Sequence, residues 1–404
     1  MIKICVLGLG YVGLPLSLTI SKKYKTAGFD INKDRIISLS ENNDINNEFK
    51  SSELKNKNIF FTNRFLDVKD YNFFIICVPT PITNKNNPNL KPLQKSFSLL
   101  SKILKKGDII VLESTVYPGV TKKYTKFLEK KTKLKSNKDF HICYSPERIN
   151  PGDKKNNLTK INKILAVTTK KNKIIKRIKK VYNNFCKKLI VTNNIEESET
   201  AKVIENIQRD LNIAIFNEIL MICEKLKINF SEVIRLAKTK WNFLNFQPGL
   251  VGGHCLPVDP FYLSFIANKQ KIKTITALAG RKTNDKMQFF VFDKFKEFIK
   301  KKKIKNKKCK ILIVGLSYKY GVADMRNSLN FKIYNKIKNN FVNTFYYDPF
   351  INIDNSIANF NTNIIKSFNV VIFLSKGLKF KKLYNKFYLK NPKSILDPFY
   401  YYIK

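Results

Sequence analysis

A cysteine in a glycine-rich loop is the residue best suited to covalent chemistry. The loop reads Gly252-Gly253-His254-Cys255, and Asp259 follows four residues after the cysteine. Two adjacent glycines leave room for a substrate carbon to reach the sulfur, and a thiolate is a strong nucleophile. Asp259 can orient a neighbouring group or hold a water molecule. Composition alone is equally consistent with a buried thiol in a structural loop, because free cysteines are commonly buried.

A lysine and an amide can assist such a reaction. Lys202 and Asn206 are four residues apart in a stretch with helical periodicity, so they share one helix face. A cation beside an amide donor can stabilise an oxyanion or position water. An ordinary polar helix face is the alternative interpretation of this pair.

Two further polar groups each follow a candidate strand. Glu147 lies in Ser145-Pro-Glu-Arg148, and Thr115 ends Glu113-Ser-Thr. The carboxyl edge of an open α/β sheet is where its ligands bind, so both side chains are candidates for the reaction. Turn capping is the alternative.

The N-terminus carries the pattern Gly8-x-Gly10-x-x-Gly13 between a strand and a helix. The first glycine permits a tight turn, the second lets a pyrophosphate approach the backbone, and the third allows close helix–strand packing. Phosphate oxygens are expected on the N–H groups that begin the helix. Asp30, at the end of the next strand, can accept ribose hydroxyls and would repel a 2′-phosphate. The pattern therefore predicts NAD rather than NADP; a purely structural glycine turn is the alternative.

Alternating strands and helices must position these residues. Apolar runs predict strands at residues 2–7, 26–30, 73–78, 108–113 and 140–144, with helical spacing at 14–21. Buried strands that alternate with helices predict a parallel, doubly wound sheet. Glu196–Leu226 contains no glycine or proline and predicts a long central helix, and a second long helical stretch covers about 260–300.

The opening pattern returns near the C-terminus. Lys310–Ser317 resembles Lys3–Gly10, and strands are expected at 344–347 and 370–374. We therefore predict an α/β protein with two Rossmann-like doubly wound parallel-sheet domains, joined by a long central helix and a further helical region. The predicted domains are 1–195 for NAD binding, 196–300 for the helical region and 301–404 for the second Rossmann-like unit. That unit lacks the full glycine pattern, so it should bind something other than the dinucleotide.

Composition narrows the class of protein. The 404 residues include 76 Lys and Arg against 30 Asp and Glu, a net charge of +46, which by itself would suggest nucleic acid. Arginine, the residue favoured for phosphate and base recognition, accounts for only eight of these cations, so we expect no specific nucleic-acid partner. Seven scattered cysteines and two histidines form no metal-site or disulfide pattern, which favours a cytoplasmic protein without a metal. No apolar run reaches the roughly 20 residues of a membrane span.

Together these motifs resemble the UDP-glucose/GDP-mannose dehydrogenase family, the nucleotide-sugar 6-dehydrogenases. The resemblance covers residues 1–330 strongly and the remainder weakly. The stretches around Glu147 and Cys255 are most similar to the branch that oxidises UDP-N-acetylhexosamines for surface polysaccharides. The matching stretches are Gly8–Gly13 with Asp30 and Arg35, Val78–Pro81, Glu113–Thr115, Ser145–Gly152, Lys202 with Asn206, Phe243–Asn245, Pro248–Pro260, Gly315–Lys319 and Asp324–Ser328.

The resemblance implies a four-electron oxidation of a primary alcohol to an acid with two NAD in succession. Cys255 would capture the aldehyde as a thiohemiacetal, which is oxidised to a thioester and hydrolysed. Lys202 and Asn206 would stabilise oxyanions, and Asp259, Glu147 and Thr115 would activate water or transfer protons.

The resemblance also implies which residues bind the ligands and that the chain forms a homodimer through its central helices. The cofactor contacts would come from Gly8, Gly10, Tyr11, Val12, Gly13, Asp30, Arg35, Pro79, Thr80, Thr115 and Arg326. The UDP-sugar contacts would come from Glu147, Arg148, Lys202, Asn206, Phe243, Leu244, Asn245, Gly249, Gly253 and Lys319.

The expected substrate is UDP-N-acetylglucosamine, with UDP-glucose and UDP-N-acetylmannosamine as alternatives. A two-electron hydroxyacid dehydrogenase is a more distant alternative, since it would need no cysteine. Related sequences often have Arg where Gln247 stands, and some UDP-glucose enzymes have a second glutamate where Pro151 stands. These two departures bear on substrate identity and efficiency more than on the class of reaction.

Overall fold

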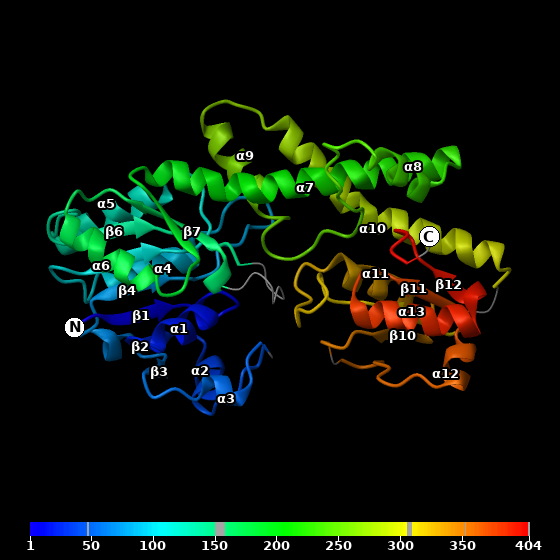
Figure 1. The fold of residues 1–404 in the computed structure, drawn as a ribbon, viewed down its shortest axis with the longest axis horizontal. Helices are drawn as coiled ribbons and strands as arrows, with labels where there is room; N and C mark the ends of the chain where they lie inside the picture. The colour runs from blue at the N-terminus through cyan, green and yellow to red at the C-terminus, as the bar shows by residue number, and fades with distance from the viewer. Residues whose placement is uncertain (47, 150–157, 305–308, 352, 403–404) are drawn as a thin grey trace. The chain divides into compact units, whose positions relative to one another are not determined.

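The strands form two sheets that belong to separate units of the chain. The computed structural model describes residues 1–46, 48–149, 158–304, 309–351 and 353–402 (Figure 1). One unit consists of Met1–Glu205 with Phe261–Ile272, and the other of Asn206–Pro260 with Lys273–Lys404. The division into three domains at residues 195 and 300 stays a prediction. In the part of the chain that is described, no helix is long and apolar enough to cross a membrane.

The first sheet is the doubly wound sheet that the alternating pattern predicts. Within the described residues it has eight strands in the order β3-β2-β1-β4-β5-β6-β7-β8. The strands are β1 (Lys3–Leu7), β2 (Lys25–Phe29), β3 (Ile59–Thr62), β4 (Phe73–Ile76), β5 (Ile109–Leu112), β6 (His141–Tyr144), β7 (Asn162–Val167) and β8 (Lys188–Thr192). Every residue of β4, β5 and β6 is buried, as expected for strands covered on both faces.

The outer strands of this sheet depart from the predicted pattern. β6 and β7 pair antiparallel, whereas the other neighbours run parallel. β3, β7 and β8 were not predicted from the sequence. β8, Lys-Leu-Ile-Val-Thr, has no fully buried residue, so it lacks the continuous apolar run that identifies a central strand.

Helices cover the first sheet and lead from strand to strand (Figure 1). They are α1 (Gly13–Ser21), α2 (Lys33–Ser40), α3 (Ser51–Leu54), α4 (Lys91–Leu100), α5 (Val120–Thr132) and α6 (Asn172–Tyr182). A core of Ile4, Val6, Ile75 and Val111 from the strands, with Leu16 from α1, is completely buried.

The predicted central helix is α7 (Ile195–Leu226), the long green helix in Figure 1. Its first turn is fixed to α5 by the carboxylate of Glu199, which accepts hydrogen bonds from the backbone N–H groups of Gly119 at 2.6 Å and Thr121 at 2.9 Å. A carboxylate at the N-terminus of α5 is favourable because the helix dipole is positive there. This contact places Lys202, one turn further along α7, within the first unit.

The helical stretch expected at 260–300 is two helices, α9 (Asp259–Lys269) and α10 (Ile275–Lys301). Lys271 ends α9 in the left-handed conformation, with φ of 59°. The N–H groups of Lys271 and Ile272 bond back to the carbonyls of Asn268 and Ala267, which is the Schellman arrangement. Glycine usually occupies the left-handed position, so a lysine there gave no signal of a helix end.

The second unit contains the parallel sheet predicted near the C-terminus. Its order within the described residues is β10-β9-β11-β12. The strands are β9 (Ile311–Val314), β10 (Thr344–Tyr347), β11 (Val370–Phe373) and β12 (Ile395–Leu396), and the helices are α8 (Phe230–Ala237), α11 (Leu329–Lys338), α12 (Thr362–Ser367) and α13 (Leu378–Lys390). One core joins this sheet to α7 and α10 through Leu220, Val291, Ile311 and Ile372.

Both sheets build the turn after their first strand in the same way. In the first sheet Asp30, after β2, accepts a hydrogen bond from Leu9 N at 2.8 Å. In the second sheet Asp348, after β10, accepts bonds from Leu316 N at 2.9 Å and Ser317 N at 3.0 Å. The repeated sequence pattern thus corresponds to a repeated turn, closed by one carboxylate in each unit.

The Asp348→Ala substitution should destabilise the second unit. It would leave two buried backbone N–H groups without their acceptor, and each such group costs roughly 1–3 kcal/mol. We expect a lower midpoint in urea unfolding followed by circular dichroism. Asp354→Ala, at an exposed position, is the matched control. Equal midpoints for the two variants would contradict this account of the turn.

Candidate active site

The glycine-rich turn between β1 and α1 has the shape that a pyrophosphate needs. Gly8 has φ of +92°, and a Cβ on Gly13 would lie 1.7 Å from the carbonyl oxygen of Gly8. A Cβ on Gly10 would meet no atom within 4 Å, so the backbone is open at that residue. No side chain caps the start of α1 at Val12. The open backbone and uncapped helix N-terminus fit the phosphates of a dinucleotide.

Charged residues behind the turn hold it in place. Asp30 accepts hydrogen bonds from Leu9 N at 2.8 Å and Asn32 N at 2.9 Å. The guanidinium of Arg35 donates to Leu9 O at 3.1 Å and pairs with Asp44 at 2.6 Å, and both side chains are buried. Arg35 therefore supports the turn from within; its predicted contact with the adenosine ribose stays a prediction.

The ends of β4 and β5 bring two of the predicted cofactor residues together. The hydroxyl of Thr80, which follows Pro79 after β4, donates to Thr115 O at 2.7 Å after β5. The hydroxyl of Tyr262 donates to Thr80 O. The predicted sheet-edge position of Thr115 is thus confirmed, and Tyr262 is a neighbour that the sequence did not single out.

Glu147 lies in a buried charge cluster at the same edge. Its carboxylate accepts bonds from the N–H groups of Arg148 and Ile149 and lies 3.4 Å from the ammonium of Lys163. Lys163 also pairs with Glu113, and both side chains are completely buried. Burial alone would lower the pKa of Lys163, but the two carboxylates raise it above the ordinary lysine value, so the ammonium remains charged. The cluster fixes the orientation of Glu147.

Arg148 has an ion-pair partner on α7, whereas none is observed for Lys202 among the described residues. Arg148, predicted to contact substrate, forms an ion pair with Glu205 of α7 at 2.6 Å. Lys202 is 8% exposed, and no hydrogen bond or ion pair of its ammonium is observed among the described residues. Most of the side chain is covered, and an ammonium with little access to solvent gains from a ligand that carries negative charge. Lys202 is therefore suited to an anionic group.

The loop with Cys255 is attached to α7. The amide of Asn206 donates to the buried carboxylate of Asp259 at 2.6 Å. The carbonyl of Cys255 accepts the N–H groups of Val258 at 3.0 Å and Asp259 at 2.9 Å, which starts the first turn of α9. Cys255 is exposed, whereas the other six cysteines are buried or half-buried. The structure thus presents this one thiol on an ordered turn.

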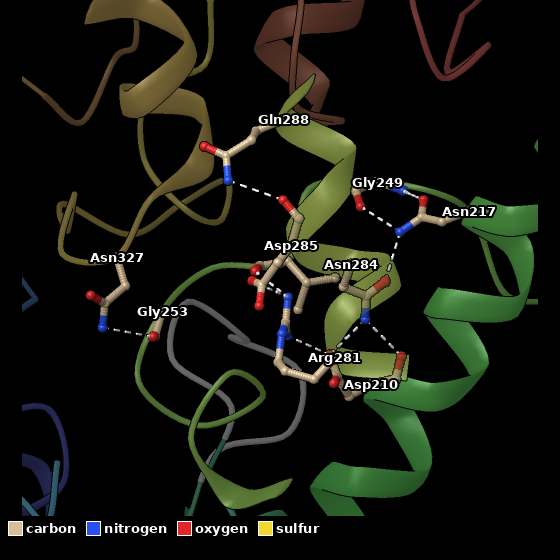
Figure 2. A network of polar contacts seen from close by, with 10 residues as sticks. Asp210, Asn217, Gly249, Gly253, Arg281, Asn284, Asp285, Gln288 and Asn327 are labelled. Atoms are coloured by element: carbon tan, nitrogen blue, oxygen red, sulfur yellow. Dashed lines mark hydrogen bonds and ion pairs between the residues drawn. The ribbon is translucent and has the colours of Figure 1, made fainter. Parts of the chain in front are cut away.

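The glycines before Cys255 pack against the turn that follows β9. Gly253 has φ of +91°, and a Cβ there would lie 2.7 Å from the ring of Tyr318. The side-chain amide of Asn327 donates to Gly253 O at 3.3 Å (Figure 2). These close contacts explain why the chain needs glycine immediately before His254 and Cys255.

His254 and Arg326 share one carboxylate. Asp324 lies 2.9 Å from the Nε2 atom of His254 and accepts bonds from Arg326 Nε at 3.0 Å and Nη2 at 2.8 Å. Burial alone would raise the pKa of Asp324, but the hydrogen bonds from His254 and Arg326 lower it well below its ordinary value. His254 therefore has a structural partner. No group of three His, Cys, Asp or Glu side chains suited to a metal occurs in the described part of the chain.

The predicted substrate loop, residues 243–249, lines a pocket. Leu244 and Asn245 are exposed, whereas Phe243 packs on Phe216 with ring centroids 5.8 Å apart. Asn217 holds Gly249 through bonds of 2.8 Å to its N–H and 3.0 Å to its carbonyl. Together with the solvent space at its mouth, the pocket has a volume of about 460 Å³, and its lining includes Phe230, Lys238, Asn245, Phe246, Gln247 and Phe399.

Of the two departures from the family pattern, only Gln247 lies among the described residues. Gln247, where an arginine is often found, accepts a hydrogen bond from the ammonium of Lys376 at 3.0 Å. A cation therefore lies beside this loop even without the arginine. Lys319 lies on the half-buried turn after β9. Pro151 lies outside the residues that the structure describes.

Several residues of the site carried no signal in the sequence. Asp210 of α7 and Arg281 of α10 form a buried ion pair at 2.7 Å, and Asn284 joins Asp210 to Asn217 (Figure 2). Lys163 lies in a strand that was not predicted. These partners are 50 or more residues apart in the chain, and no motif spacing connects them.

Three family models match the chain. The NAD-binding domain of the UDP-glucose/GDP-mannose dehydrogenase family matches residues 2–186, its central domain 196–286 and its UDP-binding domain 312–402. These matches confirm the family and the NAD-binding domain that the glycine-rich turn predicted.

Named relatives support the same family. Protein CapL of Staphylococcus aureus is 42% identical over 83% of this chain and 79% of its own length. A UDP-N-acetyl-D-glucosamine 6-dehydrogenase of Salmonella typhi is 40% identical over 87% of this chain and 83% of its own length. The solved structure of a UDP-D-ManNAc dehydrogenase from Pyrococcus horikoshii, 30% identical, covers 98% of this chain and 94% of that chain with a TM-score of 0.84, which confirms the predicted fold class.

Of two alanine substitutions in the glycine-rich turn, only the one at Gly13 should reduce stability. Gly13→Ala would place a methyl group against the Gly8 carbonyl, so we expect a loss of at least about 2 kcal/mol in unfolding free energy. Gly10→Ala has open space and should keep its stability while weakening NAD binding, measured by fluorescence titration. A stable Gly13→Ala protein would be inconsistent with this packing.

The Asp324→Asn variant tests the shared carboxylate through its pH dependence. The lowered pKa of Asp324 in the folded state means that its contribution to stability is full at neutral pH and is lost as pH falls below about 4. We expect the variant to be about 2 kcal/mol less stable than the parent at pH 7, with a smaller difference at pH 3. Asp293→Asn, on the surface, should show little difference at either pH. If the difference in unfolding free energy between Asp324→Asn and the parent were as large at pH 3 as at pH 7, the stabilising role of the Asp324 carboxylate would be excluded.

Proposed function

Because the chain belongs to the UDP-glucose/GDP-mannose dehydrogenase family, we propose that it oxidises C6 of UDP-N-acetylglucosamine to the uronic acid. Membership makes it an NAD-binding oxidoreductase of nucleotide sugars. The identities of the sugar and of the catalytic residues are proposals. We also propose that the uronic acid product is a precursor of a surface polysaccharide.

The observation that carries the proposed mechanism is the placement of Cys255. It is the one exposed cysteine of the seven, and its own carbonyl and the Asn206–Asp259 contact hold the turn on which it lies. A covalent bond to this sulfur would retain a half-oxidised sugar between two oxidations. A two-electron dehydrogenase would not need such a residue.

The proposed chemistry proceeds at one carbon. NAD, when bound at the glycine-rich turn, accepts a hydride from C6 in each of the two oxidations. The thiolate of Cys255 adds to the C6 aldehyde, and the resulting thiohemiacetal has one C6 hydrogen left to lose. Water then attacks the thioester carbonyl, the C–S bond breaks, and the carboxylate product and the thiolate are formed.

The surrounding residues have roles that match their contacts. Lys202, unpaired among the described residues, is proposed to stabilise the oxyanion at C6. Asn206 and Asp259 are already bonded to each other and are proposed to orient water for hydrolysis. Glu147 and Thr115 are proposed to assist this step from the edge of the first sheet.

UDP-N-acetylglucosamine is the preferred substrate because a dehydrogenase of that sugar is 40% identical to this chain. UDP-N-acetylmannosamine is the second candidate, favoured by the similarity to the Pyrococcus horikoshii enzyme. The pocket beside Asn245 and Gln247, with Lys238 and Lys376 near it, is the proposed site for part of the UDP-sugar.

We also propose a homodimer in the cytoplasm. Large apolar side chains are exposed along α7, at Ile204, Ile215, Ile222 and Leu226, and such surfaces commonly form interfaces. All seven cysteines are outside disulfides, which fits a reducing compartment.

Turnover of a panel of UDP-sugars by the parent and Cys255→Ala proteins tests this function. The parent should produce two NADH per UDP-N-acetylglucosamine, with the uronic acid identified by mass spectrometry. Loss of the nucleophile should reduce acid formation about 1,000-fold or more. Cys186→Ala, at a half-buried cysteine, is the matched control. Acid formation at the parental rate by Cys255→Ala would overturn the covalent mechanism, and faster turnover of UDP-N-acetylmannosamine would favour the second substrate.

A further inference from the structure

Three polar residues form one buried stripe along α7. Asn206, Asp210 and Asn217 are separated by four and seven residues, so they recur on the same side of a helix with 3.6 residues per turn. Their exposed fractions are 7%, 1% and 0%. Buried polar side chains need hydrogen-bond partners. Asn206 and Asn217 bond directly to residues at the ends of the loop that carries Cys255, and Asp210 is connected to that loop through Arg281.

The stripe anchors both ends of that loop. At the C-terminal end of the loop, Asn206 donates to Asp259 at 2.6 Å. At the N-terminal end of the loop, Asn217 accepts a hydrogen bond from Gly249 N at 2.8 Å and donates one to Gly249 O at 3.0 Å. Cys255 therefore lies between two points that are both fixed to one rigid helix.

Arg281 of α10 links the middle of the stripe to the loop. Its Nη1 atom lies 2.7 Å from Asp210, and its Nη2 atom donates to Val251 O at 3.4 Å and to Asp285 at 3.1 Å (Figure 2). The amide of Asn284 donates to the same oxygen of Asp210 at 2.7 Å and its carbonyl accepts from Asn217 at 2.8 Å. Two connected branches thus reach the loop at Gly249 and Val251.

A glycine permits this arrangement. A Cβ on Gly280 would lie 2.6 Å from the side chain of Leu211, so α7 and α10 approach closely at that point. Gly280 precedes Arg281 and Leu211 follows Asp210. The close approach therefore brings the buried guanidinium to its carboxylate.

Stability alone does not account for the ion pair. Arg281 Nε and Asp210 Oδ2 are buried and have no hydrogen-bond partner among the described residues. Apolar side chains of similar size often replace buried ion pairs without loss of stability. The contacts that such a replacement could not provide are the directional bonds to the loop backbone.

We propose that Arg281, with Asp210, Asn284 and Asn217, is a positioning network that sets the backbone of residues 249–255 and thereby the place of the Cys255 sulfur. The inference rests on the proposed function for its effect on turnover. Its structural part, the ordering of the loop by Arg281, is independent of that function. Arg281 acts through the loop and touches neither substrate nor cofactor in this account.

Hydrogen exchange of the full-length protein tests the structural part. Arg281→Lys keeps a cation beside Asp210, which favours folding, but loses the planar fork that reaches Asp210, Val251 O and Asp285 at the same time. We expect at least about fivefold faster exchange in peptides covering residues 249–258, while β1, β4 and β9 keep their parental protection. Arg235→Met removes an exposed arginine of α8 and should change neither region. Unchanged exchange at 249–258, or faster exchange throughout the second unit, would overturn the proposal.

Steady-state kinetics of the same variants test the effect on the reaction. Arg281→Lys should lower kcat about tenfold with NAD affinity within twofold of the parent, and Arg281→Met should lower kcat further. A lower kcat together with faster exchange at residues 249–258 would support the proposal that Arg281 positions the loop. Faster exchange at residues 249–258 with parental kcat would overturn the link between the loop and turnover, whereas the role of Cys255 is decided separately by the Cys255→Ala variant. If the parent oxidises no UDP-sugar, the proposed function fails, and the exchange result still decides whether Arg281 orders the loop.

Discussion

The bidentate contact between the amide of Asn217 and the peptide groups of Gly249 is the interaction on which the candidate site depends. An asparagine amide that pairs with both the N–H and the carbonyl of one residue fixes that residue in position and in orientation. Together with the Asn206–Asp259 contact, it makes the cysteine loop an extension of α7 rather than an independent surface loop. A nucleophile gains from such rigidity because its reaction requires a defined approach to one carbon.

Charge is distributed differently at the surface and in the interior. The many lysines give the chain its net charge of +46, and few of them are buried. Inside, Lys163, Arg35 and Arg281 each face a carboxylate, as desolvated cations require. Lys202 differs from them, since no carboxylate in the described chain neutralises it. This contrast between paired structural cations and one unpaired cation is the electrostatic reason to place it at a reacting centre.

The sequence predicted those elements that are defined by a local pattern of apolar residues and glycines. β1, α1 and the glycine-rich turn follow from apolar spacing and three glycines, and the turn after β9 follows from its similarity to the first. The end of α9 was missed because Lys271 adopts a left-handed conformation that glycine usually marks. Arg281 was missed because its partner Asp210 lies 71 residues away, and only the packing of α7 on α10 brings them together. The family resemblance predicted Cys255 as the nucleophile. The contacts that anchor its loop join residues far apart in the chain, so no motif spacing indicates them.

The repeated turn assigns different tasks to the two halves of the chain. In the first, the segment Gly8-Leu9-Gly10 leaves its backbone uncovered, since the third residue has no side chain and open space above it. In the second, Gly315-Leu316-Ser317 has a hydroxymethyl group at the same place, which is fully buried and bonded to Asp348 at 2.9 Å. The same turn therefore leaves its backbone open in the first unit, whereas in the second unit the side chain of Ser317 fills that position. Tyr320 also stands where the first turn has Gly13, so two of the three glycines are replaced in the second copy.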